Sequence, residues 1–128
     1  MSILKDQSLA ESGRRKIRWV RDFMPALGRI EERFAREQPF AGLRIAVSVH
    51  LEAKTAHLVE VLARGGAQMS VTGSNPLSTQ DDVAAGLASL GVETYAAHGV
   101  NGEEYEKLLV EALSCRPDLI IDDGGDLL

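Results

Sequence analysis

The stretch Asp118-Leu119-Ile120-Ile121-Asp122-Asp123-Gly124-Gly125-Asp126 decides how the rest of this sequence is interpreted. Its apolar run, Leu119 to Ile121, predicts a short buried strand of a parallel sheet. Three carboxylates around two glycines follow at once, and glycines allow a sharp turn and a close approach by a ligand. Open α/β sheets bind ligands at the carboxyl ends of their strands, so the stretch predicts a binding edge. The alternative is an acidic turn in which Asp126 caps a following helix.

Upstream of this stretch, apolar runs alternate with amphipathic segments. The predicted strands cover residues 43–49, 68–72, 92–96 and 119–121. The predicted helices cover residues 53–64, a segment that ends at Leu90 with Ser78 or Thr79 as its cap, and 103–114. Strands that alternate with helices form parallel sheets through right-handed crossovers. The predicted fold class is therefore α/β: a Rossmann-like, three-layer fold with a parallel four-stranded sheet and flanking helices.

A helical segment precedes the sheet. From Gly13 to Gln38, apolar residues recur every three or four positions, which predicts an amphipathic helix. Pro25 interrupts the pattern, so we expect either a kink or two helices with Asp22 capping the second. The chain is thus organised as one domain, with a helical segment at 13–38 and βαβ units over 43–128.

Two further polar segments accompany the acidic stretch, one after each of the first two predicted strands. They are His50-Leu51-Glu52-Ala53-Lys54-Thr55 and Gly73-Ser74-Asn75-Pro76-Leu77-Ser78-Thr79-Gln80. In a doubly wound sheet of order 3-2-1-4, the first and fourth strands are neighbours across the point where the strand order reverses. The three polar segments are then expected to share one crevice at the carboxyl edge.

The candidate residues allow different roles. His50, a lone histidine at a strand end, is either a proton shuttle or a structural histidine. Asp123 is suited to binding a hydroxylated ligand or to acting as a base. Glu52 and Lys54 either line the pocket or form a capping pair. His57 and His98 are interpreted as surface or packing residues, and no spacing in the chain resembles a zinc site.

Composition excludes several classes of protein. The 45% hydrophobic and 26% charged residues are typical of a globular protein, and no run is long enough to span a bilayer. The single cysteine, Cys115, excludes an internal disulfide and suits a cytoplasmic location.

Charge is distributed unevenly along the chain. Residues 1–40 hold nine basic and six acidic side chains (+3), and residues 41–128 hold five basic and thirteen acidic side chains (−8). The basic run Arg14–Arg21 is interleaved with apolar residues, so a solvated helix face or a subunit contact is favoured over nucleic-acid binding.

A dinucleotide fingerprint is missing. No Gly-x-Gly-x-x-Gly occurs, and the glycine pairs at Gly65-Gly66 and Gly124-Gly125 do not fit it.

Three motifs, in order, resemble S-adenosylhomocysteine hydrolase. They are Ser48-Val49-His50-Leu51-Glu52-Ala53-Lys54-Thr55-Ala56, Gly73-Ser74-Asn75-Pro76-Leu77-Ser78-Thr79-Gln80-Asp81-Asp82 and Ile121-Asp122-Asp123-Gly124-Gly125-Asp126-Leu127. The resemblance covers nearly the whole chain from about Gly13. The His50–Thr55 segment is more similar to the archaeal and thermophilic-bacterial branch, since members more like the animal enzyme carry Thr and Glu in place of Glu52 and Lys54.

The resemblance implies an activity. The family reversibly splits S-adenosylhomocysteine into adenosine and homocysteine, and a tightly held NAD oxidises the ribose 3′-hydroxyl so that homocysteine is eliminated and water adds. By motif, His50 and Asp123 are the implied catalytic residues, near the leaving sulfur and on the substrate respectively. The implied substrate-binding residues are Glu52, Lys54, Thr55, Ser74, Asn75, Ser78, Thr79, Gln80 and Asp123.

The resemblance also implies what this chain lacks. The full enzyme is more than three times as long, and its NAD-binding domain and catalytic lysine follow the point that corresponds to Leu128. We therefore expect residues 1–128 to be a partial substrate-binding domain. Alone, it is expected to hold no NAD and to have no catalytic activity. The resemblance also implies a homo-oligomer, which is usual in the family. The alternatives are a stand-alone nucleoside or small-metabolite binding module and a partner protein of a full-length relative.

Overall fold

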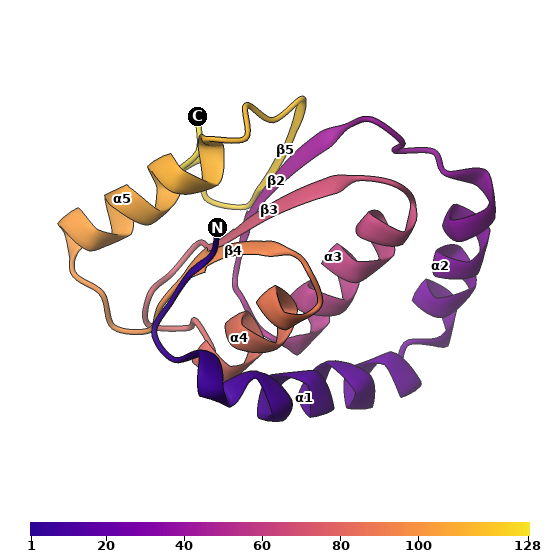
Figure 1. Ribbon diagram of the computed structural model, residues 1–128, viewed down its shortest axis with the longest axis horizontal. Helices are drawn as coiled ribbons and strands as arrows, with labels where there is room; N and C mark the ends of the chain where they lie inside the picture. Colours follow the sequence, from indigo (N-terminus) through magenta and orange to yellow (C-terminus); the bar gives the residue numbers. More distant parts are fainter.

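The computed structural model describes residues 1–128 as one parallel sheet with helices on both faces (Figure 1). The strands are β1 (Ile3–Leu4), β2 (Arg44–Val49), β3 (Gln68–Gly73), β4 (Glu93–Ala96) and β5 (Leu119–Asp122). The helices are α1 (Ala10–Asp22), α2 (Pro25–Glu37), α3 (Ala53–Arg64), α4 (Asp81–Ser89) and α5 (Gly102–Leu113), and a 3-10 turn, η1 (Gln7–Leu9), precedes α1. The predicted α/β, Rossmann-like fold is confirmed.

The sheet runs in the order β1-β4-β3-β2-β5, and every pair is parallel. The predicted order 3-2-1-4 is confirmed as β4-β3-β2-β5. The predicted number of strands is wrong, because β1 adds a fifth strand beside β4 through Ile3↔Tyr95 and Leu4↔Ala96. Two residues are too few to show the alternation by which a strand is found in a sequence.

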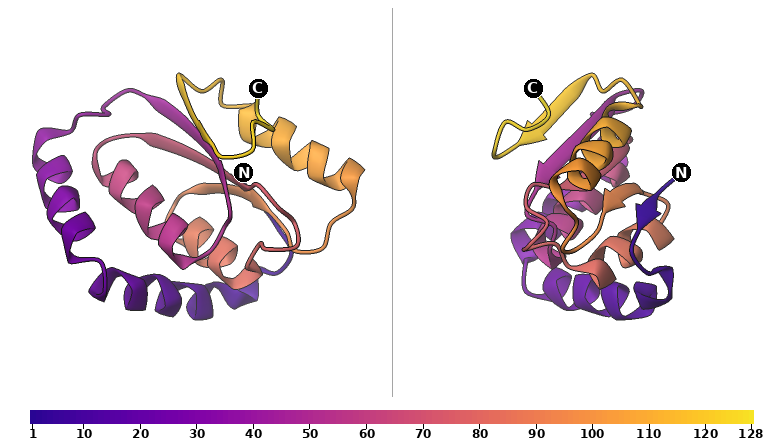
Figure 2. Two further views of the ribbon diagram at one scale, coloured as in Figure 1. Left: turned by 180° about the vertical axis from the view of Figure 1, so that it is seen from behind. Right: turned by 90° about the vertical axis from the view of Figure 1, so that its left-hand side faces the viewer.

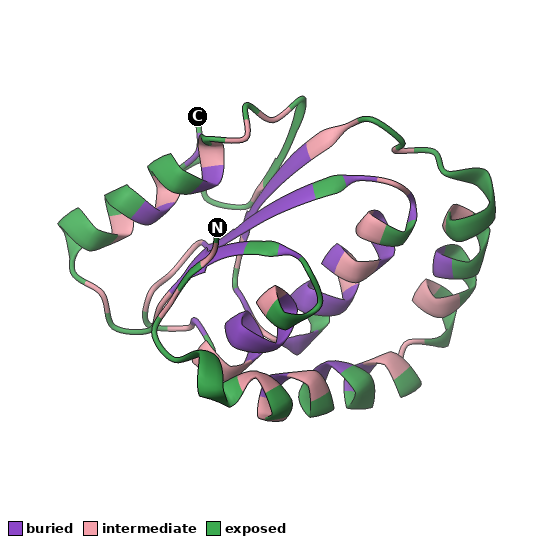
Figure 3. Cartoon of the chain, in the orientation of Figure 1, coloured by how far each residue is buried: buried purple, intermediate pink, exposed green.

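One face of the sheet carries most of the apolar core. Ile45 and Val47 of β2 and Met69 and Val71 of β3 point to this face, which α3 and α4 cover, and α1 packs against these two helices. Figure 3 shows the buried residues gathered on the central strands and on the inner sides of α3 and α4. Because apolar burial is the main favourable term in folding, this face supplies most of the stability.

Helices α1 and α4 approach one another very closely. A Cβ atom on Gly13 would collide with the Asp82 carbonyl, and one on Gly86 would lie 2.8 Å from the Arg14 nitrogen. Glycine at both positions is therefore what lets the amino-terminal helix lie against the sheet domain, and a larger residue at either would separate the two helices.

The amino-terminal segment is two helices, as one of the two alternatives predicted. Asp22 does not cap the second helix: it is the last residue of α1, and Met24 is the cap of α2 without a side-chain bond. Pro25 occupies the first position of α2, where its missing N–H costs nothing and its fixed φ suits the helix. Of the expected apolar stripe, Phe23 and Ile30 are exposed.

The other face of the sheet carries small and mostly polar side chains. Ala46 and Ser48 of β2 and Ser70 and Thr72 of β3 point to it, and all four are buried. Helix α5 lies on this face, apart from the other helices, as the two views in Figure 2 show. Ser70 donates from Oγ to the Ala112 carbonyl of α5 at 2.7 Å. Small side chains thus allow α5 to lie close to β3 and β4.

Strand β5 is not buried, contrary to prediction. Leu119, Ile120 and Ile121 are 49%, 37% and 37% exposed. The reason is position: β5 pairs only with β2, at the edge of the sheet, whereas α5 covers β3 and β4. An apolar run predicts a strand but does not distinguish a central strand from an edge strand.

Other local predictions have mixed outcomes. Neither Ser78 nor Thr79 caps α4, because Gln80 holds the cap position and makes no side-chain cap bond. Asp126 caps no helix and instead accepts a hydrogen bond from Tyr105. His57 is a packing residue, completely buried, and His98 is exposed, which confirms both interpretations. None of the helices has the length and hydropathy needed to cross a membrane.

Candidate functional site

The three polar segments meet at the carboxyl edge of the sheet, where β2 lies between β3 and β5. The backbone joins them directly: Ser74 donates from its N–H to the Val49 carbonyl, and Asp123 donates to the Ser48 carbonyl, both at 3.2 Å. Adjacent strands lie about 4.8 Å apart, so the backbone at His50 and that at Asp123 are separated by roughly one strand spacing. The carboxyl edge therefore brings together polar residues from three distant parts of the sequence.

His50 is held by the loop that follows β3. Its Nδ1 lies 2.6 Å from the Ser78 hydroxyl, which also lies 3.2 Å from the Asn75 carbonyl. The serine hydroxyl has one proton, so when it donates to Asn75 the imidazole must donate from Nδ1. Nε2 is then the free acceptor of an exposed ring. This pairing orients the imidazole and leaves one nitrogen available to exchange a proton.

Asn75 organises the loop around it. Its side-chain oxygen accepts the Leu77 N–H at 2.9 Å, and its carbonyl accepts from the N–H of Ser78 and of Thr79, both at 3.1 Å. The Thr79 hydroxyl donates to the same carbonyl at 3.0 Å, and Thr79 is 5% exposed. Asn75 and Thr79 therefore bond chiefly to the backbone of their own loop. The half-buried Ser78 contacts His50 through its hydroxyl, and the half-buried Ser74 bonds to Val49 and Tyr105 through its backbone.

Glu52, Lys54 and Thr55 are separated by the start of α3. Glu52 caps the helix: Oε1 accepts from the Lys54 and Thr55 N–H groups at 3.0 and 3.1 Å. Lys54 and the buried Thr55 line an open apolar hollow of about 670 Å³ against α2, formed with residues such as Leu27. Glu52 therefore caps α3, but the expected capping pair with the Lys54 side chain is not formed, because the partners of Glu52 are backbone N–H groups.

Gln80 lies with Glu52 in a groove of about 400 Å³ along α1. Lys16 donates to Gln80 Oε1 at 3.2 Å and pairs with Asp82 at 2.8 Å. The sequence alone gave no indication that α1 borders this part of the edge, since the helix and the loop are more than sixty residues apart.

The acidic loop after β5 is organised from within by Asp122. Its carboxylate accepts the N–H groups of Gly124, Gly125 and Leu127 at 3.0, 2.8 and 2.8 Å. Burial raises the pKa of Asp122, but these three bonds outweigh it and the net shift is downward. Gly125 has a φ of +80°, which favours glycine. Asp122 is therefore a structural carboxylate, and Asp123 beside it is exposed to solvent.

Tyr105 belongs to the site although the sequence analysis missed it. Its hydroxyl lies 2.9 Å from Asp126 Oδ2 and 3.1 Å from the Ser74 carbonyl, so it contacts two of the three polar segments. Burial, followed by the bond to Asp126, raises the pKa of Tyr105 to about 12. An aromatic residue in the first half of a predicted helix carries no signal of such a contact.

The turn between β2 and α3 does not fit a dinucleotide. A pyrophosphate would need a glycine-rich turn and free N–H groups at the helix start. Here Leu51 fills the turn, completely buried, and the Glu52 carboxylate already accepts two of the N–H groups. A bound pyrophosphate at this position would be repelled by the negative charge of that carboxylate. No group of three or more His, Cys, Asp or Glu residues is arranged to hold a metal ion.

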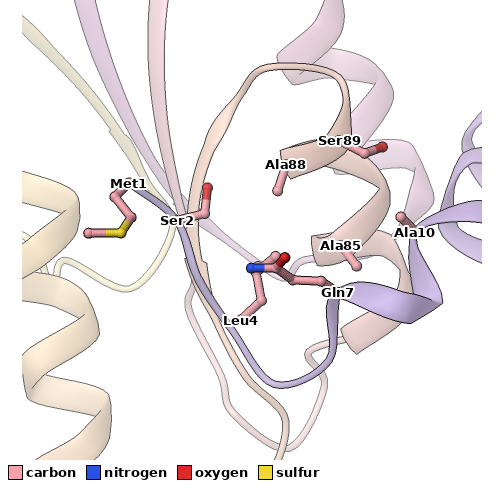
Figure 4. Close-up of a pocket in the computed structure, with 8 residues that line it drawn as sticks. All are labelled: Met1, Ser2, Leu4, Gln7, Ala10, Ala85, Ala88 and Ser89. Carbon is pink, nitrogen blue, oxygen red and sulfur yellow. The ribbon is translucent and has the colours of Figure 1, made fainter.

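A separate cavity of about 290 Å³ lies beside the outer strand β1, between the amino-terminal segment and α4 (Figure 4). In the figure, Leu4 and Gln7 face Ala85 and Ala88 across it. Since β1 and β5 are the two outer strands, the cavity beside β1 and the loop that holds Asp123 after β5 lie on opposite sides of the sheet's width, and none of the cavity's lining residues belongs to the three polar segments.

Comparison with known proteins places the chain among its relatives. A family model described as S-adenosyl-L-homocysteine hydrolase matches residues 2–128. An S-inosyl-L-homocysteine hydrolase of Methanococcus maripaludis is 53% identical over 128 residues, which are 100% of this chain and 31% of the relative. An adenosylhomocysteinase of Pyrococcus abyssi is 52% identical, and the match covers 98% of this chain and 30% of the relative. An adenosylhomocysteinase of Thermotoga maritima is 50% identical, and the match covers 91% of this chain and 29% of the relative.

The chain spans about 30% of the length of these relatives. The match covers almost every residue, including the three motifs at the carboxyl edge. The chain belongs to the S-adenosyl-L-homocysteine hydrolase family.

Proposed function

We propose that residues 1–128 are the amino-terminal part of a substrate-binding domain, and that their carboxyl edge binds the nucleoside of an S-nucleosyl-homocysteine. The observation that carries the proposal is the His50–Ser78 contact of 2.6 Å beside the loop that presents Asp123. An oriented imidazole with one free nitrogen and an exposed carboxylate one strand away suit a ligand that carries hydroxyl groups and undergoes proton transfer.

In this proposal the whole enzyme catalyses the reversible reaction of S-adenosyl-L-homocysteine with water to give adenosine and L-homocysteine. His50, through Nε2, exchanges protons at the leaving sulfur and at the water that adds. Asp123 accepts a hydrogen bond from a sugar hydroxyl and takes part in proton transfer. Ser78 keeps the imidazole in place, and Ser74, Asn75, Thr79 and Gln80 shape the loop against which the nucleoside lies.

The proposal assigns NAD to segments outside this chain. The β2–α3 turn, where Glu52 occupies the helix start, is the physical reason. Residues 1–128 alone are then expected to retain no NAD through gel filtration and to release no homocysteine. Retained NAD or measurable homocysteine release would contradict this part of the proposal. A cytoplasmic location and a homo-oligomeric assembly belong to the same proposal.

The choice of base is open to a direct test, because relatives named for adenosyl and for inosyl substrates match this chain about equally well. Calorimetric titration of the 128-residue chain with adenosine and then with inosine compares the two. An Asp123→Asn variant removes the proposed contact, and Asp22→Asn, an exposed residue at the end of α1, is the matched control.

Saturable binding that Asp123→Asn abolishes and Asp22→Asn preserves supports the proposal. Absence of binding by a folded wild-type chain shows that the nucleoside site needs further residues. Equal loss in both variants contradicts the role of Asp123.

A second candidate function is that of a partner protein for a full-length relative. The observation that favours it is the pair Trp19 and Phe23 on α1, which are 63% and 68% exposed and whose rings lie 4.6 Å apart. Co-purification of such a relative that is lost on changing both residues to Asp supports it. Retention of the partner by that variant excludes α1 as the contact.

A further inference from the structure

Tyr105 is the only side chain outside the three polar segments that contacts two of them through one atom. It lies in the first half of α5, whose start is fixed by reciprocal bonds between Asn101 and Glu104, each at 3.0 Å. Its own N–H donates to the Asn101 carbonyl at 2.9 Å. The aromatic ring is therefore attached to a well-defined helix terminus, and its half-buried hydroxyl reaches the carboxyl edge of the sheet.

The hydroxyl acts as a hydrogen-bond donor at neutral pH. With its pKa raised to about 12 by burial and by Asp126, it keeps its proton. That proton is shared between the Asp126 carboxylate at 2.9 Å and the Ser74 carbonyl at 3.1 Å. The charged acceptor forms the stronger bond, while the carbonyl remains within hydrogen-bonding distance.

Besides Tyr105, the loop after β5 is attached to the sheet by the Asp123 N–H, which donates to the Ser48 carbonyl at 3.2 Å, but only Tyr105 connects it to the β3–α4 loop. Asp122 accepts three of its backbone N–H groups, but these bonds lie within the loop and do not fix it relative to the β3–α4 loop. Asp123 and Asp126 are separated by two glycines, which have the greatest backbone freedom of any residue. A bond from Asp126 to a helix that also contacts Ser74 therefore limits how Asp123 can move relative to His50.

We propose that Tyr105 is a positioning residue: by bonding Asp126 and Ser74 together, it sets the place of Asp123 relative to the His50–Ser78 pair. The consequence for ligand affinity rests on the proposed function, whereas the consequence for the loop does not. The two can be measured separately on the same proteins.

The decisive variant is Tyr105→Phe, which removes the hydroxyl and keeps the ring. Tyr95→Phe is its matched control, because the Tyr95 hydroxyl donates to Glu93 at 2.7 Å and its pKa is also raised to about 12. Tyr95 lies on β4 and contacts α5 on the same face of the sheet, but it makes no bond to the three polar segments. A general effect of losing a tyrosine hydroxyl is expected in both variants.

Amide hydrogen exchange of the free chain tests the loop directly. In Tyr105→Phe the amides of Gly124, Gly125 and Leu127 are expected to exchange at least about fivefold faster than in Tyr95→Phe, because local opening becomes easier. Equal exchange of these amides in the two variants overturns the proposal, whether or not the chain binds a nucleoside.

Nucleoside affinity and the His50 ring signals in NMR test the consequence for the site. Tyr105→Phe is expected to bind adenosine or inosine about tenfold more weakly than Tyr95→Phe at equal thermal stability, since a bond to a charged group is lost. The ligand-induced shift of the His50 ring signals is expected to shrink with it. Asp126→Asn keeps an acceptor and should restore most of the affinity that Asp126→Ala loses.

Unchanged affinity and unchanged His50 signals in Tyr105→Phe overturn the positioning role. If the wild-type chain binds neither nucleoside, the proposed function of this chain fails, and the exchange experiment still decides whether Tyr105 holds the loop.

Discussion

The two faces of the sheet differ in what covers them and in what they do. On one face, Ile45, Val47, Met69 and Val71 form the large core together with residues of α1, α3 and α4. On the other face, small and polar residues lie under one helix, and only Tyr95, Leu108 and Ala112 form a second cluster. The helix on this second face, α5, carries Tyr105, which bonds to two of the polar segments of the candidate site. We infer that stability is divided unequally between the two faces, with the larger share on the well-covered one.

The largest expected effect comes from opening a cavity on each face in turn. Leu87 of α4 is completely buried in the large core, and Leu108 of α5 is 6% exposed in the small cluster. Leu87→Ala should destabilise the protein by about 2–5 kcal/mol, with Leu108→Ala at or below the lower end of that range. Urea unfolding measures both. If Leu108→Ala is the more destabilising, the division between the faces is wrong.

A gain of stability is expected from His57, which lies on the well-covered side within α3. It is completely buried, and neither ring nitrogen has a hydrogen-bond partner, although Glu60 Oε2 lies 3.7 Å from Nδ1. An unsatisfied buried polar group costs about 1–3 kcal/mol, so His57→Leu should stabilise the chain by roughly 1 kcal/mol at neutral pH. Thermal unfolding beside His98→Leu, an exposed control, checks this. Destabilisation by His57→Leu would show that the imidazole has a partner in solution.

Acid should act first on the less covered face. The pKa of Asp122 is below its ordinary 3.8, so the native loop favours the charged carboxylate. The stabilising contribution is present above pH 3.8 and is lost as the pH falls through the lowered native pKa. The amide signals of Gly124 and Gly125 in NMR should therefore lose their native positions in acid before those of β2 and β3 do. In Asp122→Asn this acid-dependent step should disappear.

The smallest effect is expected on the outer surface of the amino-terminal helices. Phe23 is 68% exposed, and its ring lies 4.6 Å from that of Trp19. Phe23→Ser should change the free energy of unfolding by no more than about 0.5 kcal/mol in either direction. A much larger loss, measured by urea unfolding at several protein concentrations, would indicate that this surface is covered in solution by another chain.

Much of the fold was predictable because it depends on local patterns. Short runs of three to seven residues identified β2 to β5, and the alternation of strands and helices predicted the parallel order that β4, β3, β2 and β5 adopt. Strand β1 was missed because two residues carry no pattern. The caps were predicted less well: Asp22, Ser78 and Thr79 have suitable side chains, but Met24 and Gln80 hold the cap positions.

The candidate site was predicted in part. The sequence identified the segments that meet at the carboxyl edge, because strand order alone brings their ends together. The sequence did not show which residues of these segments lie away from the edge. Lys54 and Thr55 line a hollow against α2, and Thr79 is buried in its own loop. Nor did it identify Tyr105, whose partners lie 31 and 21 residues away in the chain.

The sequence by itself determined the type of each long element, the order of four strands and the family, since these follow from periodicity and from motifs of adjacent residues. Only the tertiary structure decided that β5 is an exposed edge, that Asp122 holds its loop while Asp123 faces solvent, and that Tyr105 connects two loops. The physical reason is the distance along the chain over which each property is determined. Periodicity records which side of an element is apolar, but exposure and hydrogen bonding depend on neighbours that the chain brings together only when it folds.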